Sequence, residues 1–116
     1  MEALGAHRFE DLPDGGRIQL TRNPADSAGV RAVRTHLAQI ARNFAAGDFT
    51  IPGLVHAGKQ VPGTATLTAR RKHIDYHFEL LPGGGEVRIF TRDPKSLNAI
   101  HQYLAFQRQE HRHQPS

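Results

Sequence analysis

The sequence contains no cysteine and no tryptophan, so disulfide bonds and thiolate metal ligands are excluded. Because a chain without cysteine suits reducing and oxidising compartments equally, this absence does not decide where the protein resides. No apolar run approaches the ~20 residues of a membrane-spanning helix, so we expect no membrane insertion. The apolar content is a modest 38%, with six phenylalanines and two tyrosines.

Motifs of several common catalytic mechanisms are absent as well. There is no cysteine nucleophile, no Gly-x-Ser-x-Gly elbow and no His-Glu-x-x-His run. The glycine run Gly83–Gly85 precedes a predicted strand rather than a helix, so it lacks the context of a phosphate-binding loop. We therefore expect a role in binding, transport or sensing rather than in catalysis.

The length of 116 residues fits one domain, with a core over about residues 15–111 and tails at 1–14 and 112–116. The net charge is +4 with neutral histidines, from 15 Lys and Arg against 11 Asp and Glu. These charges are interspersed, as on a solvated surface, although a basic balance also suits an anionic partner. The segment Ala3–Ala6 leaves two interpretations open: the end of a cleaved leader, which would place the protein in the periplasm, or an ordinary cytoplasmic start.

The first half of the chain predicts a strand followed by a helix. Apolar and polar residues alternate over Arg17–Arg22, as in a half-buried strand. Helix-capping residues follow in Asn23–Ser27, and Gly47 is suited to end the helix. The helix has one apolar face, formed by Val30, Val33, Leu37, Ile40, Ala41 and Phe44. Asp48–Gly63 contains two Pro-Gly pairs and predicts a long loop, of a length that is often functional.

The second half predicts a hairpin and a second helix. Thr64–Arg71 favours a strand, with a short helix as the alternative. His73–Leu81 alternates clearly, with Ile74, Tyr76, Phe78 and Leu80 inward and His73, Asp75, His77 and Glu79 outward. Pro82–Gly85 then predicts a turn, and Glu86–Thr91 a strand. Pro94 opens a helix with one face formed by Leu97, Ile100, Leu104, Gln107 and His111.

The two halves resemble each other. Gly15–Pro24 matches Gly84–Pro94 with an offset of one residue, and an amphipathic helix follows each. The sequence thus predicts an α+β fold: two strand–helix repeats with a central hairpin, in which two helices cover one face of an antiparallel sheet of three or four strands. Matching the helix faces pairs Val33 with Ile100, Leu37 with Leu104, and Phe44 with His111.

Eight histidines are the most unusual feature of the composition. Imidazole is the commonest protein ligand of transition metals, and sites with several histidines suit copper or zinc. The loop residue His56 can reach His36 on the first helix or His101 on the second. We predict a copper or zinc site formed by His56, His101 and a third ligand from His36 or His111. In the structural alternative, His56 is exposed, His101 flanks its helix and His111 is partly buried.

A second group of possible ligands is the outward row of the clearest strand. Neighbours two residues apart on one face lie about 6.6 Å apart, so two of His73, Asp75 and His77 can share a surface metal ion. The favoured interpretation is simpler: these residues are the polar side of a half-buried strand.

Several segments resemble a family of small bacterial histidine-containing proteins with no assigned activity. The resemblance covers residues 15–113, and rests on Phe44–Phe49, Val55-His56, Val61–Gly63, Ile74–Tyr76, Gly84–Thr91 and Ala99–His111. It draws attention to His56, His101 and His111. Such proteins can be labelled aspartate carbamoyltransferase, but this sequence lacks the Ser-Thr-Arg-Thr phosphate-binding motif and is too short for that enzyme, so the label is rejected.

The sequence therefore predicts a histidine-based transition-metal carrier or sensor. One alternative is a module that binds nucleic acid or another anionic partner through the open sheet face, where Arg17, Arg88 and Arg92 lie beside His73 and His77. Another is a homodimeric interaction domain, because exposed sheet edges pair readily.

Overall fold

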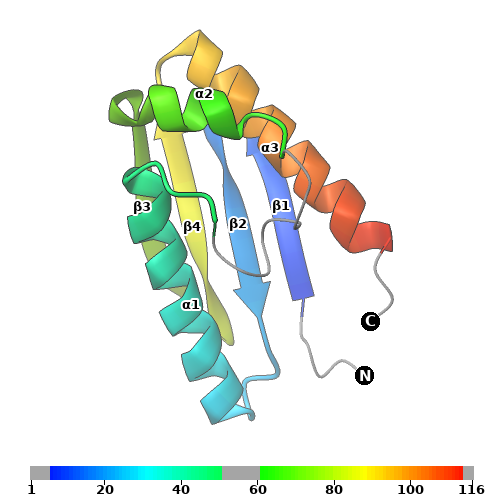
Figure 1. Ribbon diagram of the computed structural model, residues 1–116. Helices are drawn as coiled ribbons and strands as arrows, with labels where there is room; N and C mark the ends of the chain where they lie inside the picture. Colours follow the sequence, from blue (N-terminus) through cyan, green and yellow to red (C-terminus); the bar gives the residue numbers. More distant parts are fainter. Residues whose placement is uncertain (1–5, 51–60, 114–116) are drawn as a thin grey trace.

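The structure is a computed structural model that describes residues 6–50 and 61–113, with side chains through Glu110. The described residues form four strands and three helices. The strands are β1 (Ala6–Leu12), β2 (Gly15–Thr21), β3 (Ile74–Leu81) and β4 (Gly84–Thr91). The helices are α1 (Ser27–Ala45), α2 (Thr64–Ala69) and α3 (Pro94–His113), with a short 3₁₀ turn, η1, at Arg71–His73. The sheet is antiparallel in the order β1-β2-β4-β3, and α1 and α3 lie on one face of it (Figure 1). The predicted α+β class and antiparallel sheet are confirmed.

The prediction of a tail over residues 1–14 is wrong for Ala6–Leu12, which forms β1. This strand pairs with β2 along its whole length, with Phe9 opposite Ile18. Phe9 is 5% exposed and joins the core. Of the inner positions His7, Phe9 and Asp11, only Phe9 is apolar, so the alternation is too weak to reveal the strand.

The strand favoured over Thr64–Arg71 is also wrong, because Thr64–Ala69 forms α2. Leu67 is 2% exposed and belongs to the core, and α2 packs against α3. The Thr64 hydroxyl donates a hydrogen bond to the Val61 carbonyl at the start of the helix. Burial of Leu67 against α3 outweighs the strand preference of the threonines.

The internal repeat extends further than the glycine turns. The pattern Phe-Glu-x-Leu-Pro-x-Gly-Gly occurs at Phe9–Gly16 and again at Phe78–Gly85. Ile18 and its counterpart Val87 lie opposite each other in the central β2–β4 pair. The two hairpins are therefore related by an approximate two-fold axis through this pair.

Each helix covers the hairpin of the other repeat. α1 packs mainly on β3 and β4, whereas α3 packs on β1 and β2 (Figure 1). Equivalent carboxylates cap the two helices: Asp26 accepts from the Gly29 N–H at 3.0 Å, and Asp93 from the Ser96 N–H at 3.1 Å. Because each helix packs on the hairpin of the other repeat, both repeats share one core.

Glycine is required where each helix approaches the sheet most closely. A Cβ on Gly85 would lie 3.2 Å from Leu37 Cδ1 of α1 and 2.7 Å from the Phe78 ring. A Cβ on its counterpart Gly16 would collide with Leu104 Cδ1 of α3 and lie 2.9 Å from the Glu10 carbonyl oxygen. Leu37 and Leu104 thus occupy equivalent places.

None of the helices in the described residues is both long and apolar enough to cross a membrane.

We predict that Gly16→Ala and Gly85→Ala each lower the free energy of unfolding by about 1–3 kcal/mol, because the added methyl group overpacks the helix–sheet interface. Chemical denaturation measures the change. Gln39→Ala on the exposed side of α1 is the control and should stay within about 0.5 kcal/mol of the parent protein. Equal stability of all four proteins would contradict the close approach.

Asp93 holds together the end of α2 and the start of α3. Its carboxylate pairs with the Arg70 guanidinium and accepts hydrogen bonds from the N–H and hydroxyl of Ser96. The hydrogen bond from Arg70, followed by that from Ser96, holds the pKa of Asp93 well below its ordinary value. The carboxylate is therefore favoured in the folded state.

We predict that Asp93→Asn is less stable than the parent at pH 7, and that the difference shrinks as the pH falls below about 4. The sign follows from the lowered pKa: the stabilisation is present above the unfolded carboxyl pKa of about 3.9 and is lost as the folded group protonates. Thermal unfolding from pH 7 to pH 2 tests this, with Asp11→Asn, which removes an exposed carboxylate of β1, as a charge-matched control. A difference that is independent of pH would contradict the prediction.

Candidate functional site

His101 binds the carbonyl groups of the first hairpin. Its Nε2 lies 2.9 Å from the Leu12 oxygen and 2.9 Å from the Gly15 oxygen. Because both partners are acceptors, Nε2 carries the proton and donates. A metal ion could then bind only at Nδ1, because Nε2 is used for hydrogen bonds that stabilise the fold.

Comparison of the two repeats explains why a hydrogen-bond donor occupies the position of His101. Counted from the capping aspartates, the α1 counterpart of His101 is Arg34. The Arg34 guanidinium donates to the Leu81 and Gly84 carbonyls, each at 2.8 Å, and these are the counterparts of Leu12 and Gly15. Each helix therefore binds the closing residues of the opposite hairpin. These hydrogen bonds give a physical reason for the structural alternative, in which His101 is a residue on the flank of its helix.

The other predicted metal ligands are not gathered by the described part of the chain. His36 is half-buried on α1, which covers a different pair of strands from the α3 residue His101. His56 and the side chain of His111 lie outside the described residues. Within residues 6–50 and 61–110, no three His, Asp or Glu side chains come together to hold a metal ion.

The space between α1 and α3 is filled by aromatic rings. The Phe44 ring centroid lies 4.3 Å from that of Phe49 and 5.8 Å from those of Tyr76 and Tyr103. Burial raises the pKa of both tyrosines well above the ordinary value. These hydroxyls stay protonated and neutral at any physiological pH, so this region is a packed core rather than an acid–base site.

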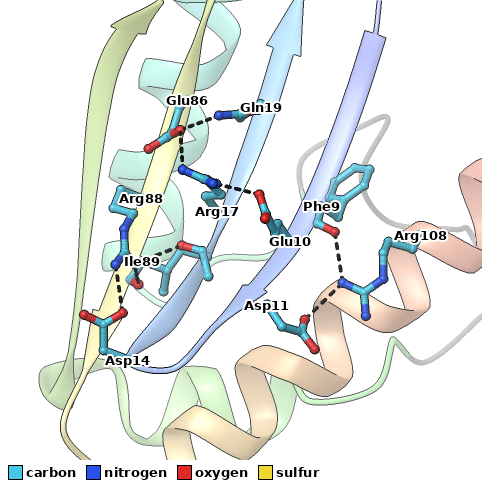
Figure 2. Close-up of polar contacts among 11 residues, drawn as sticks. Phe9, Glu10, Asp11, Asp14, Arg17, Gln19, Glu86, Arg88, Ile89 and Arg108 are labelled. Atoms are coloured by element: carbon cyan, nitrogen blue, oxygen red, sulfur yellow. Dashed lines mark hydrogen bonds and ion pairs between the residues drawn. The ribbon is translucent and has the colours of Figure 1, made fainter.

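The open face of the sheet carries a network of charged side chains (Figure 2). Arg17 Nε donates to Glu10 Oε1 at 2.7 Å, and Arg17 Nη1 lies 3.9 Å from Glu86 Oε1. Gln19 Nε2 donates to the same Glu86 oxygen at 2.7 Å. The hydrogen bond from Arg17 lowers the pKa of Glu10, and the same bond raises the pKa of Arg17.

Arg88 is held in place by groups of its own face. Its Nη2 donates to Asp14 Oδ1 at 2.8 Å, and its Nη1 to the Ile89 carbonyl at 2.7 Å. The guanidinium carbon also lies 4.0 Å from the centre of the Phe90 ring. The hydrogen bond from Arg88 lowers the pKa of Asp14. The charge of this arginine is therefore balanced within the protein.

These pairings weaken the nucleic-acid alternative. Two of the three predicted phosphate-binding arginines, Arg17 and Arg88, already bind carboxylates. At the end of this face a groove of about 520 Å³ contains cations and anions side by side, and its lining consists of Asp14, Lys72, His73, Asp75, Phe90, Thr91 and Arg92. Nucleic-acid binding instead needs an excess of unpaired positive charge along a continuous path.

The row of polar side chains that starts at His73, the last residue of η1, and continues along β3 has a different character. His73, Asp75, His77 and Glu79 are all exposed, as predicted, and alternate between imidazole and carboxylate. In the sheet, however, β3 is an edge strand rather than a central one. Leu80 near its end is 66% exposed, the largest exposure of any bulky apolar side chain in the described residues.

The free edge of β3 presents unpaired backbone groups. Leu81 and Gly84 close a two-residue turn, so the backbone of Leu81 and of every second residue before it faces β4. The N–H and C=O groups of Ile74, Tyr76, Phe78 and Leu80 therefore face outward. The Ile74 N–H donates to the Arg71 carbonyl of η1, whereas no described residue makes a hydrogen bond to the Ile74 C=O or to the N–H and C=O groups of Tyr76, Phe78 and Leu80.

The opposite edge, β1, is partly covered by a side chain of α3. Arg108 Nη1 donates to the outward carbonyl of Phe9 at 2.9 Å and also contacts Asp11 at 3.0 Å (Figure 2). The α1 counterpart of Arg108 is Ala41, which has no group to bind the equivalent carbonyl of Phe78. The two repeats thus differ at their edges: an α3 side chain occupies an outward carbonyl of β1, and α1 has no equivalent side chain for β3. The alternation of the row was visible in the sequence, but its position at an edge was not.

We predict that His101→Ala lowers the free energy of unfolding by about 1–3 kcal/mol, because two carbonyl groups lose their donor. His101→Arg should recover most of this loss, since Arg34 performs the same task in the other repeat. Chemical denaturation provides the measurement, and copper or zinc titration of His101→Arg provides the comparison. Unchanged stability of His101→Ala, together with loss of metal binding in both variants, would make His101 a ligand instead.

In comparisons with known proteins, no family model matches the chain, and neither the curated proteins nor the solved structures give a match. The resemblance to small bacterial proteins stays untested.

Proposed function

We propose that this protein is a self-associating binding module in which two copies join their β3 edges into one eight-stranded antiparallel sheet. The observation that carries this proposal is the difference between the two edges. On β1 the outward Phe9 carbonyl is occupied by Arg108, whereas on β3 Tyr76, Phe78 and Leu80 offer backbone donors and acceptors that no described residue uses. A strand from another chain satisfies such groups directly.

A second copy is the occupant that the side chains favour. An antiparallel pair of β3 strands with the two-fold axis at Tyr76 places Asp75 opposite His77 of the second copy, and it brings His73, the last residue of η1, next to Glu79. By symmetry the reverse pairs form too, so all four pairs join an imidazole to a carboxylate. Cross-strand pairs of this kind each contribute about 0.2–1 kcal/mol.

Other registers satisfy fewer of these pairs. With the axis at His77, Asp75 faces Glu79 and His77 faces itself. With the axis at Phe78, only His77 and Glu79 pair favourably. Like groups directly opposite each other destabilise a sheet, so the row specifies its own alignment.

The apolar side chain at this edge supports the same proposal. Leu80 is 66% exposed in the single chain, and in the register centred on Tyr76 it lies at the end of the junction, beside the η1 turn of the second copy, which contains Lys72. The methylene groups of lysine can cover such a side chain while its amine remains in water.

We predict a dimer by light scattering at about 100 μM chain, and a monomer for His77→Asp, which places Asp opposite Asp75. The double variant Asp75→His/His77→Asp restores an imidazole opposite each carboxylate and should restore the dimer. Arg8→Asp is the matched control, because Arg8 is the counterpart of His77 on strand β1. A monomeric parent protein, or a dimeric His77→Asp, would contradict the proposal.

The absence of cysteine allows a separate test of the register. Residues directly opposite each other in a non-hydrogen-bonded pair have Cα atoms about 4.5 Å apart, which suits a disulfide. A mixture of Asp75→Cys and His77→Cys proteins should therefore crosslink under mild oxidation, whereas each variant alone should not. Crosslinking of His77→Cys alone would place the axis at His77 and overturn the alignment.

A further inference from the structure

We infer that the β3–β3 junction is a divalent transition-metal site, with Zn²⁺ bound on the two-fold axis by Asp75 and His77 of both copies. This inference rests on the proposed dimer. Two imidazole nitrogens and two carboxylate oxygens are a ligand set of the kind that zinc takes in tetrahedral coordination. The second copy is essential, because the described part of one chain contains no group of three ligands.

The geometry of an antiparallel sheet brings these four side chains together. Along one strand, Asp75 and His77 lie on the same face about 6.6 Å apart. Across the junction, each faces the other kind at a Cα distance of about 4.5 Å. The four side chains thus stand at the corners of a small rectangle whose centre is the two-fold axis, and all are exposed in the single chain.

The neighbouring strand leaves this position free of competing cations. Arg88 lies directly opposite His77 on β4, but its guanidinium binds Asp14 and two backbone carbonyls and stacks on Phe90. Phe90 lies opposite Asp75, and its ring contacts the His77 ring edge-on with centroids 5.7 Å apart. An aromatic wall and a fixed arginine therefore border the site on the β4 side.

The remaining members of the row stabilise the junction without binding the ion. His73 and Glu79 lie next to each other at both ends of the rectangle, one pair on each side of the axis. They lie two residues from the central ligands, and their pairing keeps the strands in register. The ion then adds a crosslink that either copy alone cannot supply.

Calorimetric titration of the full chain with Zn²⁺ tests the site. We expect one ion per two chains, and light scattering should show that Zn²⁺ increases the dimer fraction and that a chelator lowers it. His77→Ala and Asp75→Asn should each weaken Zn²⁺ binding by roughly tenfold or more. His36→Ala removes a histidine of α1, away from the junction, and should keep both the affinity and the stoichiometry of one ion per two chains.

The outcomes separate the metal site from the dimer. A parent protein that is dimeric but binds no Zn²⁺ overturns the metal site and leaves the proposed function intact. A parent protein that is monomeric with and without Zn²⁺ overturns both. One ion per chain, bound equally by His77→Ala, overturns the junction site and favours the ligand set predicted from the helices and the loop, His56 and His101 with His36 or His111.

Discussion

The fold depends on hydrogen bonds that each helix makes to the hairpin of the other repeat. Arg34 on α1 binds the carbonyls that close the β3–β4 turn, and His101 on α3 binds those that close the β1–β2 turn. Each bond joins residues far apart in the sequence. Because these contacts cross between repeats, each hairpin is covered mainly by the helix of the other repeat, and the two repeats form one core together.

The packing of each helix on the opposite hairpin also explains why the two turns share one sequence pattern. The second glycine of each Phe-Glu-x-Leu-Pro-x-Gly-Gly segment lies under a leucine of the crossing helix. A side chain there would push the helix away from the sheet and with it the donor that binds the turn. The close approach and the hydrogen bonds are therefore parts of the same constraint, which acts twice in the chain.

Local sequence patterns predicted much of this structure. The helix faces, the turns and the strands at Arg17–Arg22, His73–Leu81 and Glu86–Thr91 follow from apolar periodicity and from glycine and proline positions. β1 was missed because its apolar pattern is weak, although the repeated eight-residue pattern contains the signal. α2 was missed because threonines favour strands, and its helix depends on the burial of Leu67.

The functional surface was harder to predict for a different reason. Sequence spacing shows that His73, Asp75, His77 and Glu79 share a face, but it does not show which strand lies at an edge. His101 drew attention as a ligand because its carbonyl partners are almost 90 residues away in the chain. Its role became visible only by comparison with Arg34, since an arginine is never a metal ligand candidate.

The difference between the edges limits what kind of assembly the sheet can form. If both edges were open, each new copy would add another free edge, and pairing would continue into a filament. Arg108 occupies the outward carbonyl of Phe9 on β1, whereas Ala41 leaves the equivalent position on β3 uncovered. Pairing of β3 with β3 uses the same surface on both copies, so it closes after two chains. The difference between Arg108 and Ala41 within the approximate two-fold repeat therefore favours a dimer over an open-ended sheet.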